Sequence, residues 1–274
     1  MHSIKELLEF GRLELKDTSE IPNKESRILL AHLLDKDLIW LITHDEEKVT
    51  CKKAYQELLE RLKSHEPIEY ITNKASFYNE EFYVDARVLI PRPETEILVD
   101  KVLFTCKEFE TPSIVEIGCG SGIISIMLAL LLPKAKIKAV DISLSALEVA
   151  LINAKKFGLE DRIEFIQSDL LENIEEKSFD VLVSNPPYIA DNESLHVKLS
   201  YEPSNALFGG VVGDELLKKI IDIFLQRDIK ILACEMGYDQ KEKISEYLKE
   251  YNLQAEFYQD LAGLDRGFVL KKEQ

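Results

Sequence analysis

Apolar residues recur at helical spacing through the first part of the chain. Three stretches, over residues 4–13, 28–34 and 55–62, carry leucine, isoleucine or tyrosine at intervals of three or four positions. Glycine, which weakens helices, occurs only once before residue 67, at Gly11. We therefore predict that residues 1–66 form a small domain of helices that serves recognition or support.

The hydrophobic spacing then changes. Aromatic and β-branched residues, beginning with Tyr70 and Thr72 and continuing to Val84, indicate strands joined by a turn at Asn79–Glu81. We predict that residues 67–90 form a β-hairpin linker to the rest of the chain.

Strands and helices alternate in the remaining part, residues 91–274. Two prolines stiffen its first residues, and a helix over 95–107 is expected to follow. Strands are predicted at 113–117, 136–140, 163–166, 181–184 and 229–234. Further helices are predicted at 122–132, 144–157, 215–226 and 241–251, and a closing hairpin at 255–259 and 267–271. This alternation is typical of a doubly wound α/β fold with a mostly parallel sheet, in which ligands bind at the carboxyl ends of the strands.

Composition and charge narrow the range of functions. A hydrophobic content of 46% with 31% charged residues is ordinary for a globular protein and excludes a wholly disordered chain. The formal net charge of −16 argues against DNA or RNA as a partner, because nucleic-acid binding depends on lysine and arginine displacing counterions. No apolar run approaches the ~20 residues that span a bilayer, and the first residues do not follow the pattern of a signal peptide. We therefore expect a cytoplasmic protein with no membrane partner.

The cysteines and histidines do not indicate a metal site or a disulfide. The four cysteines stand far apart in the sequence, and neither a CxxC nor an HExxH pattern occurs. We therefore expect no metal ion and no disulfide framework.

A glycine-rich turn follows the first strand of the α/β part. It consists of Gly118, Cys119, Gly120, Ser121 and Gly122. Glycines at alternate positions permit positive φ angles and let a ligand lie against bare backbone. Asp141, at the end of the next strand, is placed to accept hydrogen bonds from both ribose hydroxyls of a nucleoside ligand. The alternative is a tight turn followed by a helix cap at Asp141.

The sequence Asn185-Pro186-Pro187-Tyr188 ends the fourth strand. The two prolines make this segment rigid and favour extended backbone at the residues before them. The side-chain oxygen of Asn185 and the carbonyl oxygen of Pro186 then form two fixed acceptors, which suit an –NH2 group. Tyr188 supplies an aromatic wall for a planar, nitrogen-bearing group. The alternative is a simple turn that ends the strand.

The spacing of the glycine turn resembles motif I of the class I S-adenosyl-L-methionine-dependent methyltransferases. The resemblance implies that this donor is bound and S-adenosyl-L-homocysteine released, on a seven-stranded Rossmann-like sheet. It also implies that Asp169 and Leu170, after the third strand, lie beside the adenine, and that Asn185 touches the donor. Asp169 as the cap of the following turn is the alternative. Glu116 orders either the loop alone or the loop and the amino group of the donor.

The sequence NPPY resembles the motif of methyltransferases that act on conjugated nitrogen, either adenine N6 or the amide of glutamine. Three further segments, 90–96, 201–210 and 235–237, make the chain similar to the peptide-chain release factor glutamine methyltransferase family (PrmC/HemK) over residues 67–268. One departure from the family pattern occurs at 211–216.

The resemblance implies a substrate and roles for residues. The substrate is the glutamine of the GGQ motif in class 1 peptide-chain release factors, and the methyl group goes to its side-chain amide nitrogen. The residues implied in binding or catalysis are Asn185, Pro186, Pro187, Tyr188 and Arg92. Arg92 either lines the site or forms an ion pair with Glu94 or Glu96. Residues 1–66 are expected to dock the protein substrate, and the protein is expected to act as a monomer.

Two other functions are weaker candidates. An adenine-N6 methyltransferase needs a basic surface that recognises nucleic acid, and this acidic chain does not supply one. A non-catalytic scaffold that only binds the donor is disfavoured because the glycine turn and NPPY are both intact.

Overall fold

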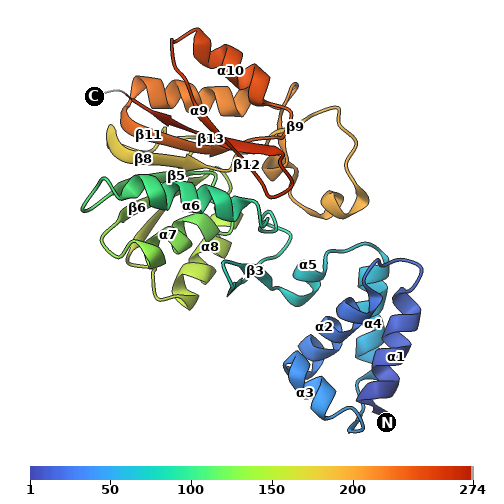
Figure 1. Cartoon of the computed structure of the whole chain (residues 1–274). Coiled ribbons are helices and arrows are strands. Elements are labelled where there is room, and N and C mark those ends of the chain that lie inside the picture. Colours follow the sequence, from blue (N-terminus) through green and yellow to red (C-terminus); the bar gives the residue numbers. More distant parts are fainter. Residues whose placement is uncertain (273–274) are drawn as a thin grey trace. The chain divides into compact units, whose positions relative to one another are not determined.

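The computed structural model describes residues 1–272. The chain divides into two compact units, and Figure 1 labels most of their elements. One unit comprises Met1–Lys74 together with Leu195–Tyr201, and the other comprises Ala75–Ser194 and the chain from Glu202 onward. Among the described residues, every helix is too short or too polar to cross a lipid bilayer.

The first unit consists mainly of helices, as predicted. They are α1 (Ile4–Leu15), α2 (Pro22–Leu34), α3 (Leu38–Thr43), α4 (Lys52–Lys63) and α5 (Ile68–Thr72), with a short strand pair between β1 (His2–Ser3) and β2 (Lys48–Val49). Helix α1 begins at a capping box, in which the Ser3 hydroxyl accepts from the Glu6 N–H and the Glu6 carboxylate accepts from the Ser3 N–H. Buried residues such as Leu7, Leu29 and Leu59 form the core of this unit.

The prediction that Tyr70 and Thr72 belong to a strand is wrong. Both residues lie in helix α5, which follows Pro67 and is capped at its C-terminal end by Asn73, where φ is 55°. Ile71 of this helix packs into the core of the first unit. Tertiary packing therefore outweighs the strand preference of aromatic and β-branched residues.

The predicted hairpin is present, but its turn is displaced. It joins β3 (Ala75–Phe77) to β4 (Glu80–Phe82), and the turn is Tyr78-Asn79 rather than Asn79–Glu81. Both turn residues have left-handed φ angles, 53° and 60°, as in two-residue turns whose twist matches that of the strands. The Tyr78 N–H donates to the Glu96 carboxylate at 2.7 Å, which fixes the turn against the next helix.

The second unit is built on a seven-stranded sheet with the order β12-β13-β11-β8-β5-β6-β7. Neighbouring strands are parallel except at β13, which runs antiparallel to β11 and β12. The strands are β5 (Ser113–Ile117), β6 (Lys136–Asp141), β7 (Ile163–Gln167), β8 (Ser178–Ser184), β11 (Asp228–Glu235), β12 (Glu256–Gln259) and β13 (Asp265–Lys271). The mostly parallel, doubly wound sheet predicted from the sequence is confirmed.

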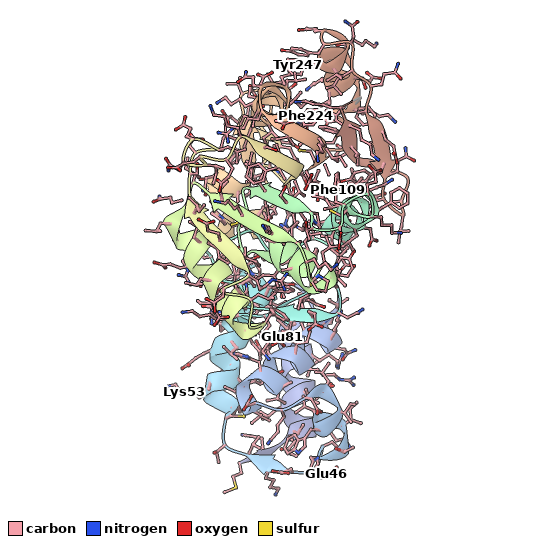
Figure 2. All side chains as sticks on the ribbon, turned by 90° about the vertical axis from the view of Figure 1, so that its left-hand side faces the viewer. Glu46, Lys53, Glu81, Phe109, Phe224 and Tyr247 are labelled. Atoms are coloured by element: carbon pink, nitrogen blue, oxygen red, sulfur yellow. The ribbon has the colours of Figure 1, made fainter. Side chains whose placement is uncertain are left out.

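Helices cover both faces of this sheet (Figure 1). On one face lie α6 (Thr95–Cys106), α7 (Ile123–Leu131) and α8 (Leu144–Lys156), and on the other α9 (Glu215–Gln226) and α10 (Lys241–Lys249). Strand β11 contributes Ile231 to the first core and Leu232 to the second, because successive side chains of a strand point to opposite faces. Phe224 of α9, labelled in Figure 2, is fully buried in the second core.

The order of the sheet reverses between β5 and β8. From β5 the chain continues through β6 and β7 toward one edge, and it then returns to place β8 on the other side of β5. At such a reversal the connections leave in opposite directions, so a crevice opens at the carboxyl ends of the strands. The residues that directly follow β5, β6 and β8 are therefore positioned to form a binding site.

Candidate functional site

A cavity of about 440 Å³ lies at the carboxyl ends of these strands, within the second unit. Residues that line it come from 116–124, 141–146, 168–170 and 185–187, after four neighbouring strands, and from 87–95 and 203–219. This volume is in the range of sites that enclose a small organic ligand. The reversal of strand order thus produces a site large enough for a nucleoside-sized molecule.

The glycine turn after β5 has the backbone conformation that its sequence predicts. The φ angles of Gly118, Gly120 and Gly122 are 72°, 53° and 80°. A Cβ atom on Gly118 or Gly120 would meet nothing within 4 Å, so the backbone conformation rather than crowding calls for glycine there. At Gly122 a Cβ atom would approach that of Ala150 to 3.1 Å. Gly122 therefore serves close packing against α8, and it does not line the cavity.

Asp141 holds the glycine turn and the start of α8 together. One carboxylate oxygen accepts from the Gly120 N–H at 2.8 Å and the other from the Ser143 N–H at 2.9 Å. Burial raises the pKa of Asp141, and the backbone N–H donors oppose this shift. The cap of α8 is Ser143, whose hydroxyl accepts from the Ala146 N–H at 3.2 Å, and not Asp141. Each oxygen of Asp141 keeps one lone pair that a ligand hydroxyl at the cavity wall can use.

Glu116 connects β5 to the first turn of α7. Its carboxylate accepts hydrogen bonds from both the backbone N–H, at 3.0 Å, and the hydroxyl of Ser125. The side chain is buried, and burial raises the pKa of Glu116 to about 8. Glu116 thus satisfies a backbone donor that the start of the helix leaves without an intrahelical partner.

The segment after β7 turns its acidic residue toward the cavity. The Ser168 hydroxyl accepts from the Asn173 N–H at 3.0 Å, and Leu170 has a left-handed φ of 49°. Capping of this turn therefore belongs to Ser168 and not to Asp169, which is exposed at the cavity wall. The alternative role predicted for Asp169 is not the one that the structure shows.

Asn185, directly after β8, is held by its amide nitrogen. Its Nδ2 donates to Thr95 Oγ1 at 3.1 Å, and Thr95 Oγ1 donates to Glu235 Oε2 at 2.8 Å. Asn185 lines the cavity, and no described residue donates a hydrogen bond to its Oδ1. The carboxamide oxygen is therefore available as an acceptor for a ligand.

The rest of NPPY divides between the cavity and its surroundings. Pro187 lines the cavity, whereas Pro186 is buried and Tyr188 lies outside the lining. Burial raises the pKa of Tyr188 to about 12, and the nearby negative charge of Glu235 adds to this shift. The aromatic wall expected from Tyr188 is thus absent from the cavity as the structure has it.

A second loop supports NPPY from behind. Strand β9 (Ile189–Ala190) pairs with β10 (Phe208–Gly210), so the two loops run side by side. A Cβ atom on Gly209 would lie 2.3 Å from the carbonyl oxygen of Pro187, which shows how closely the two backbones approach. Gln240 donates to the carbonyl oxygens of Tyr188, at 3.1 Å, and Gly213, at 2.9 Å. The departure at 211–216 leaves this support in place.

The predicted ion pair of Arg92 with Glu94 or Glu96 is wrong. Arg92 pairs with Glu202, at 2.5 Å, and Glu202 also accepts from the Ile90 N–H at 3.0 Å. The Glu202 side chain is only 3% exposed. A buried carboxylate requires a cation and hydrogen-bond donors. Arg92 supplies the cation and one donor, and the Ile90 backbone N–H supplies a second donor. Arg92 also lines the cavity, as the other role considered for it requires.

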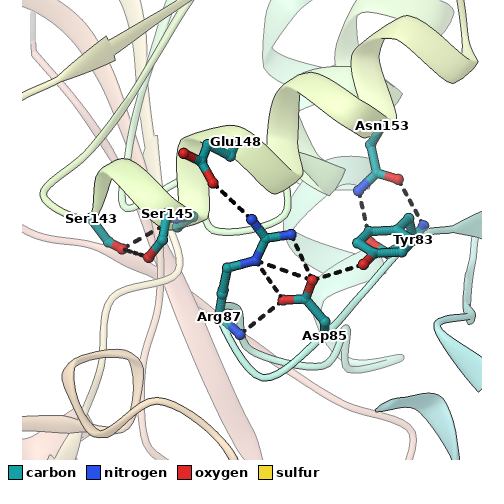
Figure 3. Close-up of polar contacts among 8 residues, drawn as sticks. Tyr83, Asp85, Arg87, Ser143, Ser145, Glu148 and Asn153 are labelled. Carbon is teal, nitrogen blue, oxygen red and sulfur yellow. Dashed lines mark hydrogen bonds and ion pairs between the residues drawn. The ribbon is translucent and has the colours of Figure 1, made fainter. Parts of the chain in front are cut away.

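The segment before Pro91 is braced against α8 by the network in Figure 3. Arg87 binds Asp85 at 2.6 Å and Glu148 at 2.8 Å, and Asp85 also accepts from the Tyr83 hydroxyl. The fully buried Asn153 binds both backbone groups of Tyr83 and donates to the carbonyl oxygen of Ser121 at 2.9 Å. The glycine turn and the segment that carries Arg87 are therefore anchored to the same helix.

Comparison with known proteins identifies the family. Residues 6–72 match the model of the PrmC N-terminal domain, and residues 94–202 match the methyltransferase small domain. The chain is 35% identical over 268 residues to the release factor glutamine methyltransferase of Koribacter versatilis, which covers 95% of this chain and 94% of that protein. This chain belongs to the release factor glutamine methyltransferase family. The family resemblance inferred from the sequence is thereby confirmed.

Other relatives of this glutamine methyltransferase family member are longer. The chain is 38% identical over 280 residues to the bifunctional methyltransferase of Rickettsia conorii, an alignment that covers 89% of this chain and 53% of that protein. The chain thus spans about half the length of the Rickettsia relatives that it matches.

Solved structures support the fold. The catalytic domain of hMettl16 in complex with the MAT2A 3′UTR hairpin 6 matches with a TM-score of 0.58 and 16% identity, over 69% of this chain and 74% of that one. The N-terminal domain of human METTL16 in complex with SAH matches with a TM-score of 0.51 and 17% identity, over 69% and 75%. At these identities the likeness concerns the fold alone.

Most of the predicted site residues line this cavity. These are Arg92, Gly118, Cys119, Gly120, Ser121, Asp141, Asp169, Leu170, Asn185 and Pro187. Their roles stay predictions, as does the division of the chain at residues 66 and 90. The sequence reasoning missed Thr95 and Glu235 as parts of the site. The one available signal was that both lie in segments that carry the family resemblance.

Proposed function

We propose that this chain transfers a methyl group from S-adenosylmethionine to the side-chain amide nitrogen of the glutamine in the GGQ motif of class 1 release factors. The observation that carries the proposal is that Asn185, with its amide nitrogen already bound to Thr95, shares one cavity with the glycine turn and Asp141. A hydrogen-bond acceptor for an –NH2 group is thereby combined with a site for a nucleoside. Family membership supports the same substrate.

The residues of the cavity fit the donor. Asp141 keeps two lone pairs for the ribose hydroxyls, and Asp169 offers an exposed carboxylate at the adenine end. Gly118 and Gly120 leave open space above bare backbone. S-adenosylmethionine, when bound, supplies a methyl group made electrophilic by its cationic sulfur.

The chain's own residues are proposed to orient the substrate amide. The Asn185 side-chain oxygen, at the cavity wall, accepts one N–H hydrogen of the amide. The carbonyl oxygen of the adjacent Pro186, a residue outside the lining, is proposed to accept the other once substrate is bound. These two bonds fix the plane of the amide and align the nitrogen lone pair with the methyl group. One N–C bond forms as the S–C bond breaks, and the amide nitrogen then loses a proton to solvent. Orientation of this kind supplies a large part of a rate enhancement when the reacting atoms are held ~3–3.5 Å apart. A strong base is not required.

The remaining parts of the proposal concern the first unit and the setting. We propose that the helical residues 1–66 dock the release factor, because the cavity and NPPY belong entirely to the second unit. The proposed location is the cytoplasm, and the proposed active form is the monomer.

Adenine-N6 methylation of nucleic acid is the competing function. The net charge of −16 opposes the binding of a phosphate backbone, and family membership favours the protein substrate.

A methyl-transfer assay with radiolabelled donor, offering release factor, DNA and RNA side by side, tests the proposal. The expected result is label in the release factor alone, and none in a factor whose GGQ glutamine is replaced by alanine. Label in DNA or RNA, or in the substituted factor to the same extent, would overturn it.

A further inference from the structure

We propose that Thr95 and Glu235 are positioning residues, which together fix the side chain of Asn185 with its oxygen toward the substrate amide. The inference deepens the proposed function and rests on it for its catalytic consequence. Thr95 lies in the wall of the cavity, whereas Glu235 is not part of its lining. In this scheme both residues act on the substrate through Asn185.

Three elements that are far apart in the sequence meet at these side chains. Glu235 ends β11 and Asn185 follows β8, and the pairing of Cys234 with Ser184 brings these two positions to the ends of adjacent strands. Thr95 is the first residue of α6. The three side chains form one chain of hydrogen bonds, from Asn185 through Thr95 to Glu235.

The series of hydrogen bonds from Asn185 to Glu235 runs in one direction because a hydroxyl carries a single hydrogen. A carboxylate only accepts hydrogen bonds, so the single hydroxyl hydrogen of Thr95 must point toward Glu235. Toward Asn185 the Thr95 oxygen then presents only lone pairs, and the amide must offer its nitrogen. Without this constraint the two ends of a carboxamide have similar shapes, and a flipped Asn185 would present N–H groups to a substrate that also presents N–H groups.

Burial prevents water from replacing these partners. Thr95 is 1% exposed and Glu235 is 2% exposed. Buried polar groups almost always have hydrogen-bond partners, and for Thr95 and Glu235 the structure shows side-chain partners. Thr95 is itself the first residue of α6, so its backbone is held by the helix.

Burial and the charges around Glu235 determine its pKa. Burial raises the pKa of Glu235 to about 7, Arg266 and Arg92 oppose this shift, and Glu94 adds to it. The other titratable groups that interact with it are the hydroxyls of Tyr188 and Tyr258. Protonated Glu235 can donate to Thr95, which frees the Thr95 hydrogen to turn toward Asn185. The direction of the chain is therefore fixed above about pH 7 and lost below it.

Thr95→Val tests the proposal, since valine keeps the shape of threonine and removes the hydroxyl. We expect kcat on release factor at saturating donor to fall at least ~10-fold, with the donor Kd within ~2-fold, because the variant loses the hydrogen bond that holds the Asn185 amide nitrogen. A tenfold change in rate corresponds to about 1.4 kcal/mol. Thr95→Ser should recover most of that activity. Thr105→Val is the matched control: Thr105 is also buried on α6, but its hydroxyl binds the carbonyl oxygen of Val102. A Thr95→Val enzyme with more than half of the wild-type kcat would overturn the proposal.

Glu235→Gln supplies a second, independent variant. If Glu235 acts through Thr95, the double variant should be no slower than Thr95→Val alone, and the fall of kcat below about pH 7 should be absent from Glu235→Gln. If the losses in kcat of the two single variants multiply in the double variant, Glu235 does not act through Thr95. That result would overturn the proposed relay, in which Glu235 fixes Asn185 through Thr95.

A spectroscopic measurement separates this inference from the proposed function. The measurement is the NMR signal of the Asn185 side-chain amide, which is assigned by its disappearance in Asn185→Ala. In both Thr95→Val and Glu235→Gln this signal should shift, and its hydrogens should exchange faster with water. An unchanged signal in these variants overturns the relay whatever the substrate is. If the signal responds as expected while wild-type enzyme leaves release factor unmethylated, the proposed function fails and the positioning of Asn185 by Thr95 and Glu235 stands.

Discussion

Replacing Asp141 by alanine tests the donor site most sharply, because this one carboxylate serves the glycine turn and the proposed ribose contact together. Its two oxygens each accept one backbone N–H, from Gly120 and Ser143, at 2.8 and 2.9 Å. One lone pair on each oxygen is left for the two ribose hydroxyls. The alanine variant therefore loses both proposed ribose contacts and releases the Gly120 N–H.

The magnitude follows from these contacts. A hydrogen bond to a charged group contributes ~1.5–3 kcal/mol, and two bonds at the lower figure give about 3 kcal/mol. We use the lower figure because the freed hydroxyls regain bonds to water at the partly open cavity. The Kd for S-adenosylmethionine should then rise ~100-fold. Asp141→Asn keeps one acceptor oxygen, so its Kd should lie between those of the wild type and Asp141→Ala, ~10-fold above the wild-type value.

Isothermal titration calorimetry with S-adenosylmethionine and S-adenosylhomocysteine measures this effect. Asp161→Ala is the matched control, since Asp161 is an exposed aspartate in the turn before β7, at the opposite end of the strands. The control should keep the wild-type Kd, and circular dichroism should show that all three variants fold. A folded Asp141→Ala protein with the wild-type donor affinity would refute the assignment of Asp141 to the ribose.

Three further predictions follow from the same structure. Asn185→Ala should lower kcat at saturating donor by ~100-fold, the scale of a reacting group misplaced by ~1 Å, and a folded variant that keeps more than about a tenth of wild-type turnover rules out the orienting role. Deleting residues 1–66 should raise the KM for intact release factor and spare donor affinity, because the two cores of the second unit contain no residue from this region; normal methylation by the folded fragment would contradict the docking role. In the folded state Glu116 keeps its proton up to about pH 8, whereas in the unfolded chain it keeps it only below its usual pKa of 4.5. The free energy of unfolding should therefore decrease as the pH rises between these values, by up to ~1.4 kcal/mol per pH unit. Denaturant titrations at pH 5.5, 6.5 and 7.5 should show this slope reduced in Glu116→Gln, and parallel slopes in the two proteins would contradict it.

The regular elements of the second unit could be predicted from the sequence because their hydrophobic periods are clear. Helix α9 occurs at the predicted residues, and most strands differ by only a few residues at their ends. The short segments before them were harder. Tyr70 and Thr72 have strand preferences, but five residues are too few for periodicity to decide, and packing against the first core makes them helical.

The site was predicted where its residues follow strands directly. The glycine turn, Asp141 and Asn185 lie at strand ends, and the fold class alone brings such ends together. The partners of these residues could not be predicted, because no local pattern connects them. Arg92 binds a carboxylate 110 positions away and Thr95 binds one 140 positions away. Only the tertiary structure reveals such pairs.

The measurement that most directly tests the account is the position of the methyl group on release factor after incubation with this enzyme and S-adenosylmethionine. Fragmentation mass spectrometry of the GGQ peptide locates it. The account predicts one added methyl group on the side-chain amide nitrogen of the glutamine, present with wild-type enzyme and strongly reduced with Asn185→Ala and Thr95→Val. A methyl group on another residue, or an unmodified peptide after turnover has been shown with a different substrate, would contradict it.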